Sequence, residues 1–326
     1  MQKMRWIVSA VAACALLAGQ TTAAQTADRY PSKPIRIIVG TTAGASPDVL
    51  ARLIGAKLGE SWKQPVVVEN RPGGNFVIAA EAAARSPADG YTLFLAIDSI
   101  MTMNPLQIDK LPYDPVKDFA PISLVAAQSM FMVASAKAPG KSLKELLAYA
   151  KANPGKVNFA ASVLTAQLIG EQIKLKEGID MQYVPFKGPP PMLQALLNGE
   201  VDFAITTFVP YANYVKEGRL RGLAVTGTRR DSPAPDAPTL TELGYPEFTY
   251  RFWLALFAPA GTPAAALERL NAETNKALND PEMKQRLAAA GLEAMPSTPA
   301  ALSQLMRDDL EKWTKVVRAA KIKLGN

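Results

Sequence analysis

Four short segments rich in small polar side chains are the places where this sequence could bind a polar ligand. The first, Thr41 to Asp48, lies between an apolar stretch and an amphipathic one. Hydroxyl groups both donate and accept hydrogen bonds, so they suit such a ligand. Each segment taken alone also fits ordinary loop chemistry. The other three segments contain, in chain order, Asp98, Ser99 and Thr102, then Ser162, Thr165 and Gln167, then Thr206 and Thr207.

The segment from Thr41 to Asp48 joins a predicted strand to a predicted helix. The apolar run Ile35 to Val39 ends at Gly40, and helical spacing begins near Asp48. The first turn of a helix has four backbone N–H groups without helical partners, and the helix dipole adds positive partial charge there. Because the preceding residues are small, an anion could approach these groups closely.

Two nucleotide-binding patterns do not fit this segment. A P-loop ends in Gly-Lys-Ser or Gly-Lys-Thr, whereas this chain has Ser46-Pro47-Asp48. A dinucleotide fingerprint needs three spaced glycines, and only Gly40 and Gly44 are present. A carboxylate held by backbone N–H groups and hydroxyls remains. The alternative, which spacing does not separate, is a tight turn in which Ser46 or Asp48 caps the helix.

The composition excludes several kinds of catalysis. The chain has no histidine, and Cys14 is its only cysteine. Ser-His-Asp and Cys-His catalysis, histidine general bases and histidine-ligated zinc are therefore excluded. An enzyme with this sequence would have to use carboxylates, lysine or tyrosine, or borrow a cofactor. We expect no catalytic residue, no metal site and no cofactor.

The N-terminus has the features of a secretory signal peptide. Lys3 and Arg5 are followed by the apolar run 6–19 and then by small residues, which predicts a signal peptide over residues 1–24. The run is too short to span a bilayer comfortably as an anchor. Its removal would leave a periplasmic chain without cysteine. The basic residues are scattered among acidic ones, so the net charge of +7 does not indicate nucleic-acid binding.

Strand-like and helix-like segments alternate along the chain. In the first part, strands are predicted at 35–39, 65–70 and 91–97, with helices at 48–63 and 79–86. The pattern returns with strands at 157–162, 181–186, 201–206 and 220–227, and helices at 142–155, 191–200 and 211–218. The last third is helical, over 264–279, 281–290 and 299–321. The alternation predicts an α/β fold of doubly wound, mainly parallel sheets covered on both faces.

Long apolar runs indicate that the chain forms two lobes. The runs 121–135 and 252–261 could each cross between lobes as one strand, with Trp253 packed in the core. We predict a first lobe of residues 25–125 and 253–326 and a second lobe of residues 126–252, hinged where the runs cross. A ligand would bind in the cleft between the lobes, where polar segments at the carboxyl ends of strands can converge. The alternative is one continuous sheet.

Several motifs together resemble one known family. They are YPSKPIRIIV at Tyr30, DVLARLIGAKL at Asp48, QPVVVENRPGG at Gln64, ADGYTL at Ala88, LPYDPVKDFAPISLVA at Leu111, VPFKG at Val184, GRLRGLAVTG at Gly218 and FAPAGTP at Phe257. The resemblance covers almost all of the predicted mature chain. The sequence is similar to the Bug family, the extracytoplasmic solute-binding receptors of tripartite tricarboxylate transporters.

The resemblance implies a two-lobed periplasmic binding protein with a type II-like fold that closes on a small carboxylate. In the family, the loops after the first and third strands hold one carboxylate, largely through backbone N–H groups and ordered water. Residues Thr41 to Asp48 match the first of these loops. The resemblance also implies a monomer that delivers its ligand to the large and small permease subunits of a membrane transporter. The alternatives are a ligand-sensing receptor for a membrane histidine kinase and, more distantly, an α/β enzyme.

The chain departs from the family pattern at three places. In the carboxylate loop, Ala45 replaces a glycine, and Pro47 has no N–H. Gln167 stands near the usual histidine of the second-lobe loop. Thr206-Thr207 replaces a frequent Asp-Asn pair, and the missing aspartate argues against an amino-acid ligand.

These departures make the far wall of the predicted cleft apolar. Val163, Leu164, Phe208 and Phe76 would form that wall. We therefore predict an aromatic or aliphatic carboxylate ligand rather than citrate. The predicted ligand-binding residues are Thr41, Thr42, Ala43, Gly44, Ala45, Ser46, Asp48, Phe76, Asp98, Ser99, Ser162, Val163, Leu164, Thr165, Thr206, Thr207 and Phe208.

Overall fold

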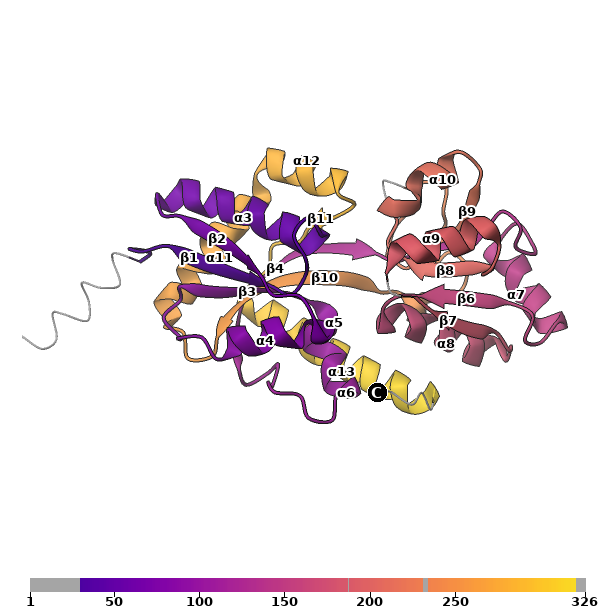
Figure 1. Cartoon of the computed structure of the whole chain (residues 1–326), viewed down its shortest axis with the longest axis horizontal. Helices are drawn as coiled ribbons and strands as arrows, with labels where there is room; N and C mark the ends of the chain where they lie inside the picture. The colour runs from indigo at the N-terminus through magenta and orange to yellow at the C-terminus, as the bar shows by residue number, and fades with distance from the viewer. Residues whose placement is uncertain (1–29, 187, 231–233, 321–326) are drawn as a thin grey trace, which may run out of the picture.

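The computed structural model describes residues 30–186, 188–230 and 234–320. The signal peptide predicted over residues 1–24 lies outside these ranges. The described chain forms two lobes that lie side by side and are joined by two neighbouring segments (Figure 1). No helix within the described ranges is both long and apolar enough to cross a membrane.

The first lobe is built on a six-stranded sheet with the strand order β11-β4-β10-β3-β1-β2. Its strands are β1 (Ile35–Val39), β2 (Val66–Asn70), β3 (Thr92–Ile97), β4 (Phe119–Ser129), β10 (Arg251–Pro259) and β11 (Glu293–Ala294). Strand β1 is parallel to β2 and β3. Strand β10 is antiparallel to both β3 and β4, so β4 runs in the same direction as β1 to β3.

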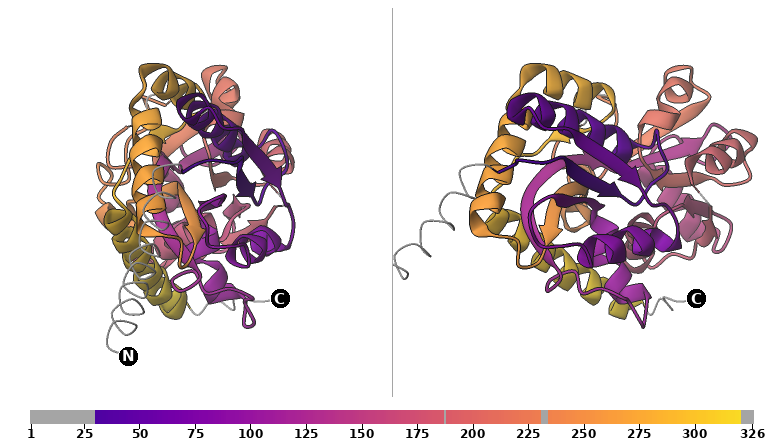
Figure 2. Two further views of the ribbon diagram at one scale, coloured as in Figure 1. Left: turned by 90° about the vertical axis from the view of Figure 1, so that its left-hand side faces the viewer. Right: turned by 60° about the vertical axis from the view of Figure 1, so that its left-hand side comes forward.

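Helices cover both faces of this sheet (Figure 2). The helices of the first lobe are α3 (Ser46–Trp62), α4 (Val77–Ala84), α5 (Asp98–Thr102), α6 (Asn104–Gln107), α11 (Ala264–Asn279), α12 (Pro281–Ala289) and α13 (Pro299–Ala320). A short 3₁₀ turn, η1 (Gly74–Phe76), precedes α4. Helices α3 and α11 contact each other, and α13 contacts α5.

The second lobe is built on a five-stranded sheet with the order β7-β6-β8-β5-β9. Its strands are β5 (Phe131–Ser135), β6 (Asn158–Ala161), β7 (Gln182–Pro185), β8 (Phe203–Thr206) and β9 (Leu220–Val225). Its helices and 3₁₀ turns are α7 (Leu143–Ala152), α8 (Leu164–Glu177), α9 (Pro189–Asn198), η2 (Val209–Tyr211), α10 (Ala212–Lys216) and η3 (Pro246–Phe248). Strand β6 is parallel to β7 and β8, and β5 is antiparallel to β8 and β9.

The strand directions place the carboxyl ends of both sheets at the gap between the lobes. Strand β4 leaves the first sheet and continues through Met130 into β5, so β1 and β3 also point toward the second lobe. Strands β6, β7 and β8 run against β5 and point back toward the first lobe. The predicted two-lobed α/β fold is therefore confirmed, but the sheets are mixed, since β10 and β11 are antiparallel to the other strands in one sheet and β5 is antiparallel to its neighbours in the other.

The hinge differs in part from the prediction. The run 121–135 crosses between lobes as predicted, since it forms β4 in one sheet and β5 in the other. The second predicted crossing is wrong in its position, because β10 lies wholly in the first sheet and the chain crosses just before it, at Tyr250. The prediction placed the crossing inside the apolar run, but that run is apolar because β10 is a central strand buried on both faces.

Thr226 links the two connections between the lobes. Its amide donates to the Met130 carbonyl at 2.9 Å, and the Tyr250 amide donates to its carbonyl at 2.8 Å. Its hydroxyl accepts from the Met130 amide at 2.8 Å and donates to the Tyr250 carbonyl at 2.6 Å. A single buried threonine thus forms hydrogen bonds with backbone N–H and C=O groups of both hinge segments.

The C-terminal helix packs against both lobes. Leu302 belongs to the apolar core of the first lobe, whereas Trp313, near the other end of α13, is fully buried in a core cluster of the second lobe. The Tyr250 ring meets the Trp313 ring edge-on at 5.2 Å. Lys312 Nζ donates to the carbonyl of Thr249 at 3.0 Å, next to the hinge. Helix α13 therefore supports the crossing as well as the first sheet.

Candidate ligand-binding site

The loop between β1 and α3 presents the first turn of α3 toward the second lobe. Within the described ranges, no side chain caps this helix, and its N-cap residue is Ala45 in an extended conformation. The alternative of a tight turn is present in part, because the Ala45 amide donates to the Thr42 carbonyl at 3.3 Å and the Gly44 amide donates to the Asp48 carboxylate at 2.8 Å. Residues Thr42 to Gly44 and Ser46 are exposed. The amides of Gly44 and Ala45 thus donate within the loop and Pro47 has no N–H, so the exposed Ser46 is the position at the helix start where an anionic group can approach.

Asp48 fixes the shape of this loop from its buried side. Its carboxylate accepts hydrogen bonds from the Gly44 amide at 2.8 Å and from Asn70 Nδ2 at 2.9 Å. Arg52 Nη2 pairs with it at 2.9 Å. Asn70 Nδ2 also donates to the carbonyl of Thr41 at 3.0 Å, which ties the start of the loop to the same network. Asp48 is 2% exposed, so the structure places it under the loop and not on its outer surface.

The surroundings of Asp48 stabilise its ionised form. The hydrogen bond from Arg52 is the largest influence, and the Gly44 amide and Asn70 act in the same direction. Together they outweigh burial and lower the pKa of Asp48 to about 2. The loop is thus held by a carboxylate that stays charged at neutral pH.

Phe76 lies beside this loop because of an unusual turn. Gly73, Gly74, Asn75 and Phe76 all have positive φ, from 50° to 116°. A left-handed residue other than glycine costs about 1–2 kcal/mol. The Asn104 side chain donates to the carbonyl of Asn75 at 3.0 Å and helps to hold the turn.

The turn brings Phe76 onto the backbone at the end of β1. A Cβ atom added to Gly40 would lie 2.9 Å from Phe76 Cβ, so only glycine fits there. The prediction that Phe76 belongs to the far wall is therefore wrong. Phe76 is part of the first lobe, next to the carboxylate loop, because the glycines before it allow the chain to turn back.

The end of β3 is a short helix where a loop was predicted. Asp98 begins α5 and is fully buried, while Ser99 is half-buried. Asp98 Oδ1 accepts from the Ser99 amide at 2.6 Å, and Oδ2 is buried without a partner among the described residues. Burial, with a contribution from nearby Asp309, raises the pKa of Asp98 well above its usual range. Trp253 donates to Asp309 at 2.7 Å and is packed in the core, as predicted.

The segment after β6 is also helical where a loop was predicted. Helix α8 begins at Leu164, so Thr165 and Gln167 lie on its first turns, and only Ser162 and Val163 join strand to helix. Thr165 is buried, and its hydroxyl has no partner among the described side chains. The buried residues Leu168, Ile169 and Ile173 have helical spacing and could have revealed this helix.

The segment after β8 is anchored by apolar packing. Thr206 ends the strand and is buried, and Thr207 and Phe208 follow it half-buried. The Phe208 ring meets the Phe131 ring edge-on at 4.7 Å. Tyr211, two residues after Val209, is fully buried. Phe208 packs on the core cluster that contains Phe131, whereas Val163 and Leu164 pack on the second-lobe cluster that contains Phe159.

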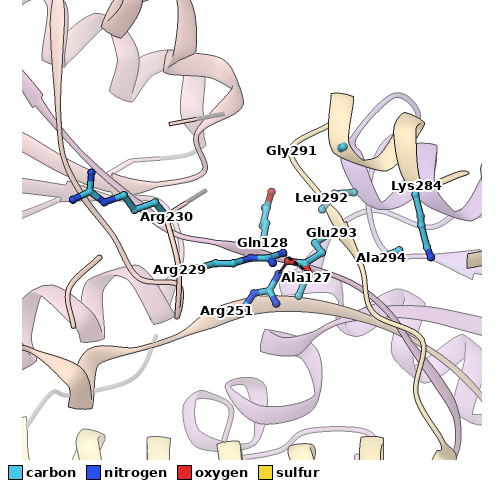
Figure 3. Close-up of a pocket in the computed structure, with 11 residues that line it drawn as sticks. Ala127, Gln128, Arg229, Arg230, Arg251, Lys284, Gly291, Leu292, Glu293 and Ala294 are labelled. Atoms are coloured by element: carbon cyan, nitrogen blue, oxygen red, sulfur yellow. Dashed lines mark hydrogen bonds and ion pairs between the residues drawn. The ribbon is translucent and has the colours of Figure 1, made fainter. Parts of the chain in front are cut away.

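A pocket lies between the lobes at the hinge, where a cleft was predicted, but its lining residues were not predicted (Figure 3). Its cavity volume is about 670 Å³, and its lining includes residues of β4, β10, β11 and the segment after β9. None of the residues predicted to bind ligand is among the described residues that line it. Its charged lining residues come from separate parts of the sequence and belong to no common motif; they are Arg229, Arg230, Arg251, Lys284 and Glu293.

The fold and the facing strand ends define a two-lobed periplasmic binding protein. The family model described as tripartite tricarboxylate transporter family receptor, TctC, matches residues 50–322, and the chain belongs to this family. The resemblance of the sequence to Bug receptors is thereby confirmed. The family's members are periplasmic receptors that bind solutes.

Relatives align over nearly the whole chain. Protein BugT of Bordetella pertussis is 37% identical over 301 residues, covering 91% of this chain and 92% of that protein. Among solved structures, R. palustris Rpa4515 with adipate is 31% identical with a TM-score of 0.80, covering 91% of this chain and all of that chain. MatC from Rhodopseudomonas palustris with bound malate is 30% identical with a TM-score of 0.74, covering 88% of this chain and all of that chain.

Proposed function

We propose that this protein captures a small carboxylate between its lobes, with the β1–α3 loop holding the charged group. The observation that carries the proposal is the start of α3, where Ser46 is exposed and no side-chain hydrogen bond caps the helix. The carboxylate of Asp48 is already occupied below the loop, so the outer amides and the hydroxyls of Thr42 and Ser46 remain for a ligand. Hydrogen bonds to a charged group contribute about 1.5–3 kcal/mol each.

We further propose that the ligand is an aliphatic or aromatic carboxylate and that citrate binds this loop less well. The proposal is supported by position: Val163 and Leu164 follow the carboxyl end of β6, and Phe208 follows that of β8. Phe76 lies beside the loop on the first lobe. Apolar side chains suit a hydrocarbon segment better than a third carboxylate. The relatives solved with adipate and malate support an acid of this size.

The proposed role is transport without catalysis. The receptor would deliver its ligand to the permease subunits of a membrane transporter, as the description of the family indicates. The ligand would leave the cleft chemically unchanged, since the predicted site relies on neutral hydrogen-bonding groups and the chain has no histidine.

A thermal-shift screen tests the proposed function. The panel contains adipate, malate, succinate, citrate, benzoate, phthalate, nicotinate and glutamate, each at equal ionic strength. A ligand that binds only the folded protein adds about 2.7 kcal/mol at a hundredfold excess over Kd. We expect a large shift with one class of aliphatic or aromatic acid, and chromatography of the recovered acid should show no conversion. A panel without any shift, or a shift with glutamate alone, would contradict the proposal.

A further inference from the structure

The pocket at the hinge has the size and position of a ligand site. It holds about 670 Å³, which lies within the usual range for small-molecule pockets. Both lobes line it, because Arg229 and Arg230 come from the segment after β9 and the other lining residues come from the first lobe. The lobes touch at its edge, where a Cβ atom on Gly291 would lie 2.6 Å from Val209 Cγ2.

The charges that line this pocket favour an anion. Four of the lining residues are cationic, namely Arg229, Arg230, Arg251 and Lys284, whereas Glu293 is the one acidic residue among the described lining residues. Arg230 is paired with Glu242, which does not line the pocket. Even with Arg230 neutralised in this way, positive charge exceeds negative charge around the cavity.

Two arginines already hold a carboxylate in this pocket. Arg229 Nη2 lies 2.7 Å from Glu293 Oε1, and Arg251 Nη2 lies 2.7 Å from Oε2. Each guanidinium thus binds one oxygen of the same carboxylate (Figure 3). Arg251 is the better fixed of the two, since its side chain is 23% exposed and Nη1 also contacts Met295 Sδ at 3.5 Å.

The ion pairs of Glu293 with these two arginines are weak. Its side chain is 42% exposed, and that of Arg229 is 74% exposed. Exposed ion pairs add little stability because water and salt screen them. Glu293 also belongs to β11, a strand of only two residues at the edge of the sheet. An anion with more than one charge could therefore replace it at small cost, in a pocket that Lys284 also lines.

We propose that this pocket is a second binding site, separate from the β1–α3 loop, which takes a small multivalent carboxylate in place of the Glu293 side chain. The bound acid would join Arg229 of the second lobe to Arg251 of the first. A bound acid at this site would therefore favour the conformation in which the two lobes are close together. Guanidinium groups match carboxylates in geometry, and they make this match already with Glu293.

Calorimetric titration with citrate tests the proposal. The three carboxylates of citrate suit the positive charge of this pocket better than the site at the β1–α3 loop. Arg229→Gln should weaken citrate binding about tenfold or more, as expected for the loss of a charge-assisted hydrogen bond. Glu293→Gln should strengthen it about three- to tenfold, since the competing charge is removed. Arg219→Gln is the matched control, because Arg219 is an exposed arginine of the same lobe that is paired with Glu217. It should leave citrate affinity unchanged at equal ionic strength.

Three outcomes would overturn this second site. The first is the absence of any citrate binding to the unmodified protein. The second is an equal loss of affinity in Arg229→Gln and Arg219→Gln. The third is citrate binding that persists in Arg229→Gln but disappears in Asp48→Ala, which would place the acid in the β1–α3 loop. That last result would also contradict the proposed ligand class, whereas the first two would leave the carboxylate loop untouched.

Discussion

The two edges that face each other across the gap are organised by different forces. In the first lobe, the β1–α3 loop is fixed by the charged network of Asp48, Arg52 and Asn70 and by a strained left-handed turn. In the second lobe, the corresponding segment after β8 is fixed by ring packing of Phe208 on Phe131.

We infer from this difference that the two lobes bind different parts of the ligand. Fixed backbone amides suit the charged end of a ligand, because they need no reorganisation when an anion arrives. Apolar side chains suit the remainder of the ligand and distinguish one acid from another by size and polarity. We infer that the first lobe supplies most of the affinity and the second lobe most of the selectivity.

The largest effect is expected when the charged network is removed. Asp48→Ala should lower the free energy of unfolding by about 2–3 kcal/mol and abolish measurable carboxylate binding, because the Gly44 amide and Asn70 lose their acceptor. Chemical denaturation and calorimetric titration measure the two effects. Glu60→Ala, at an exposed position near the other end of α3, is the control and should behave like the unmodified protein. Full carboxylate affinity in Asp48→Ala would refute the role of this network.

The same network predicts a dependence on pH. The pKa of Asp48 is lowered to about 2 in the folded protein, so its ionised form is favoured by folding. This contribution is fully present above about pH 4, the usual pKa of aspartate, and is lost as the pH falls toward 2. The difference in stability between the unmodified protein and Asp48→Asn should therefore shrink from pH 5 to pH 2. A difference that stays constant over this range would contradict the assignment.

A smaller effect is expected from substitution of Gly40, the glycine against which Phe76 packs. Gly40→Ala should displace the turn at Phe76 and lower the free energy of unfolding by about 1–3 kcal/mol, the usual result of overpacking. Carboxylate affinity should fall as the neighbouring loop shifts. Gly178→Ala is the comparison variant, because Gly178 has a positive φ but no atom within 4 Å of the added Cβ. It therefore introduces backbone strain without a steric clash. Equal ligand affinity in both variants would show that Phe76 does not support the loop.

The second lobe should respond in selectivity more than in stability. Phe208→Ala should reduce the preference for adipate over the more polar malate by up to about tenfold, which corresponds to about 1.4 kcal/mol. Competition titrations with the two acids measure this ratio. Tyr214→Ala removes a ring that packs on the same core cluster from α10 and should leave the ratio unchanged. If Phe208→Ala instead weakened both acids equally, the second lobe would contribute affinity and not selectivity.

The sequence predicted the architecture well because its signals are local. Strand β1 and helix α11 occupy the predicted residues, and the Ser142 side chain caps α7 by accepting from the Glu145 amide, as its position indicated. The apolar run that becomes β4 and β5 predicted one crossing of the hinge. These features depend on periodicity, caps and continuous apolar runs, all of which can be recognised within a short stretch of sequence.

The details of the site were harder to predict because they depend on distant residues. Asp48 could be placed at a helix start, but its partner Asn70 lies 22 residues away at the end of β2. Arg229 and Glu293 meet only because the hinge brings the two lobes together. The position of Phe76 follows from four consecutive positive φ angles, which composition alone does not reveal.

The most direct test of the account is an NMR titration of isotopically labelled protein with the acid that gives the largest thermal shift. We expect that the amide signals of Thr42, Ala43 and Ser46 change most and that those of Thr207 and Phe208 change at the same ligand concentrations. This result would place one acid between the facing edges of the two lobes. Changes confined to Arg229, Arg251 and Glu293, with the β1–α3 loop unaffected, would contradict it.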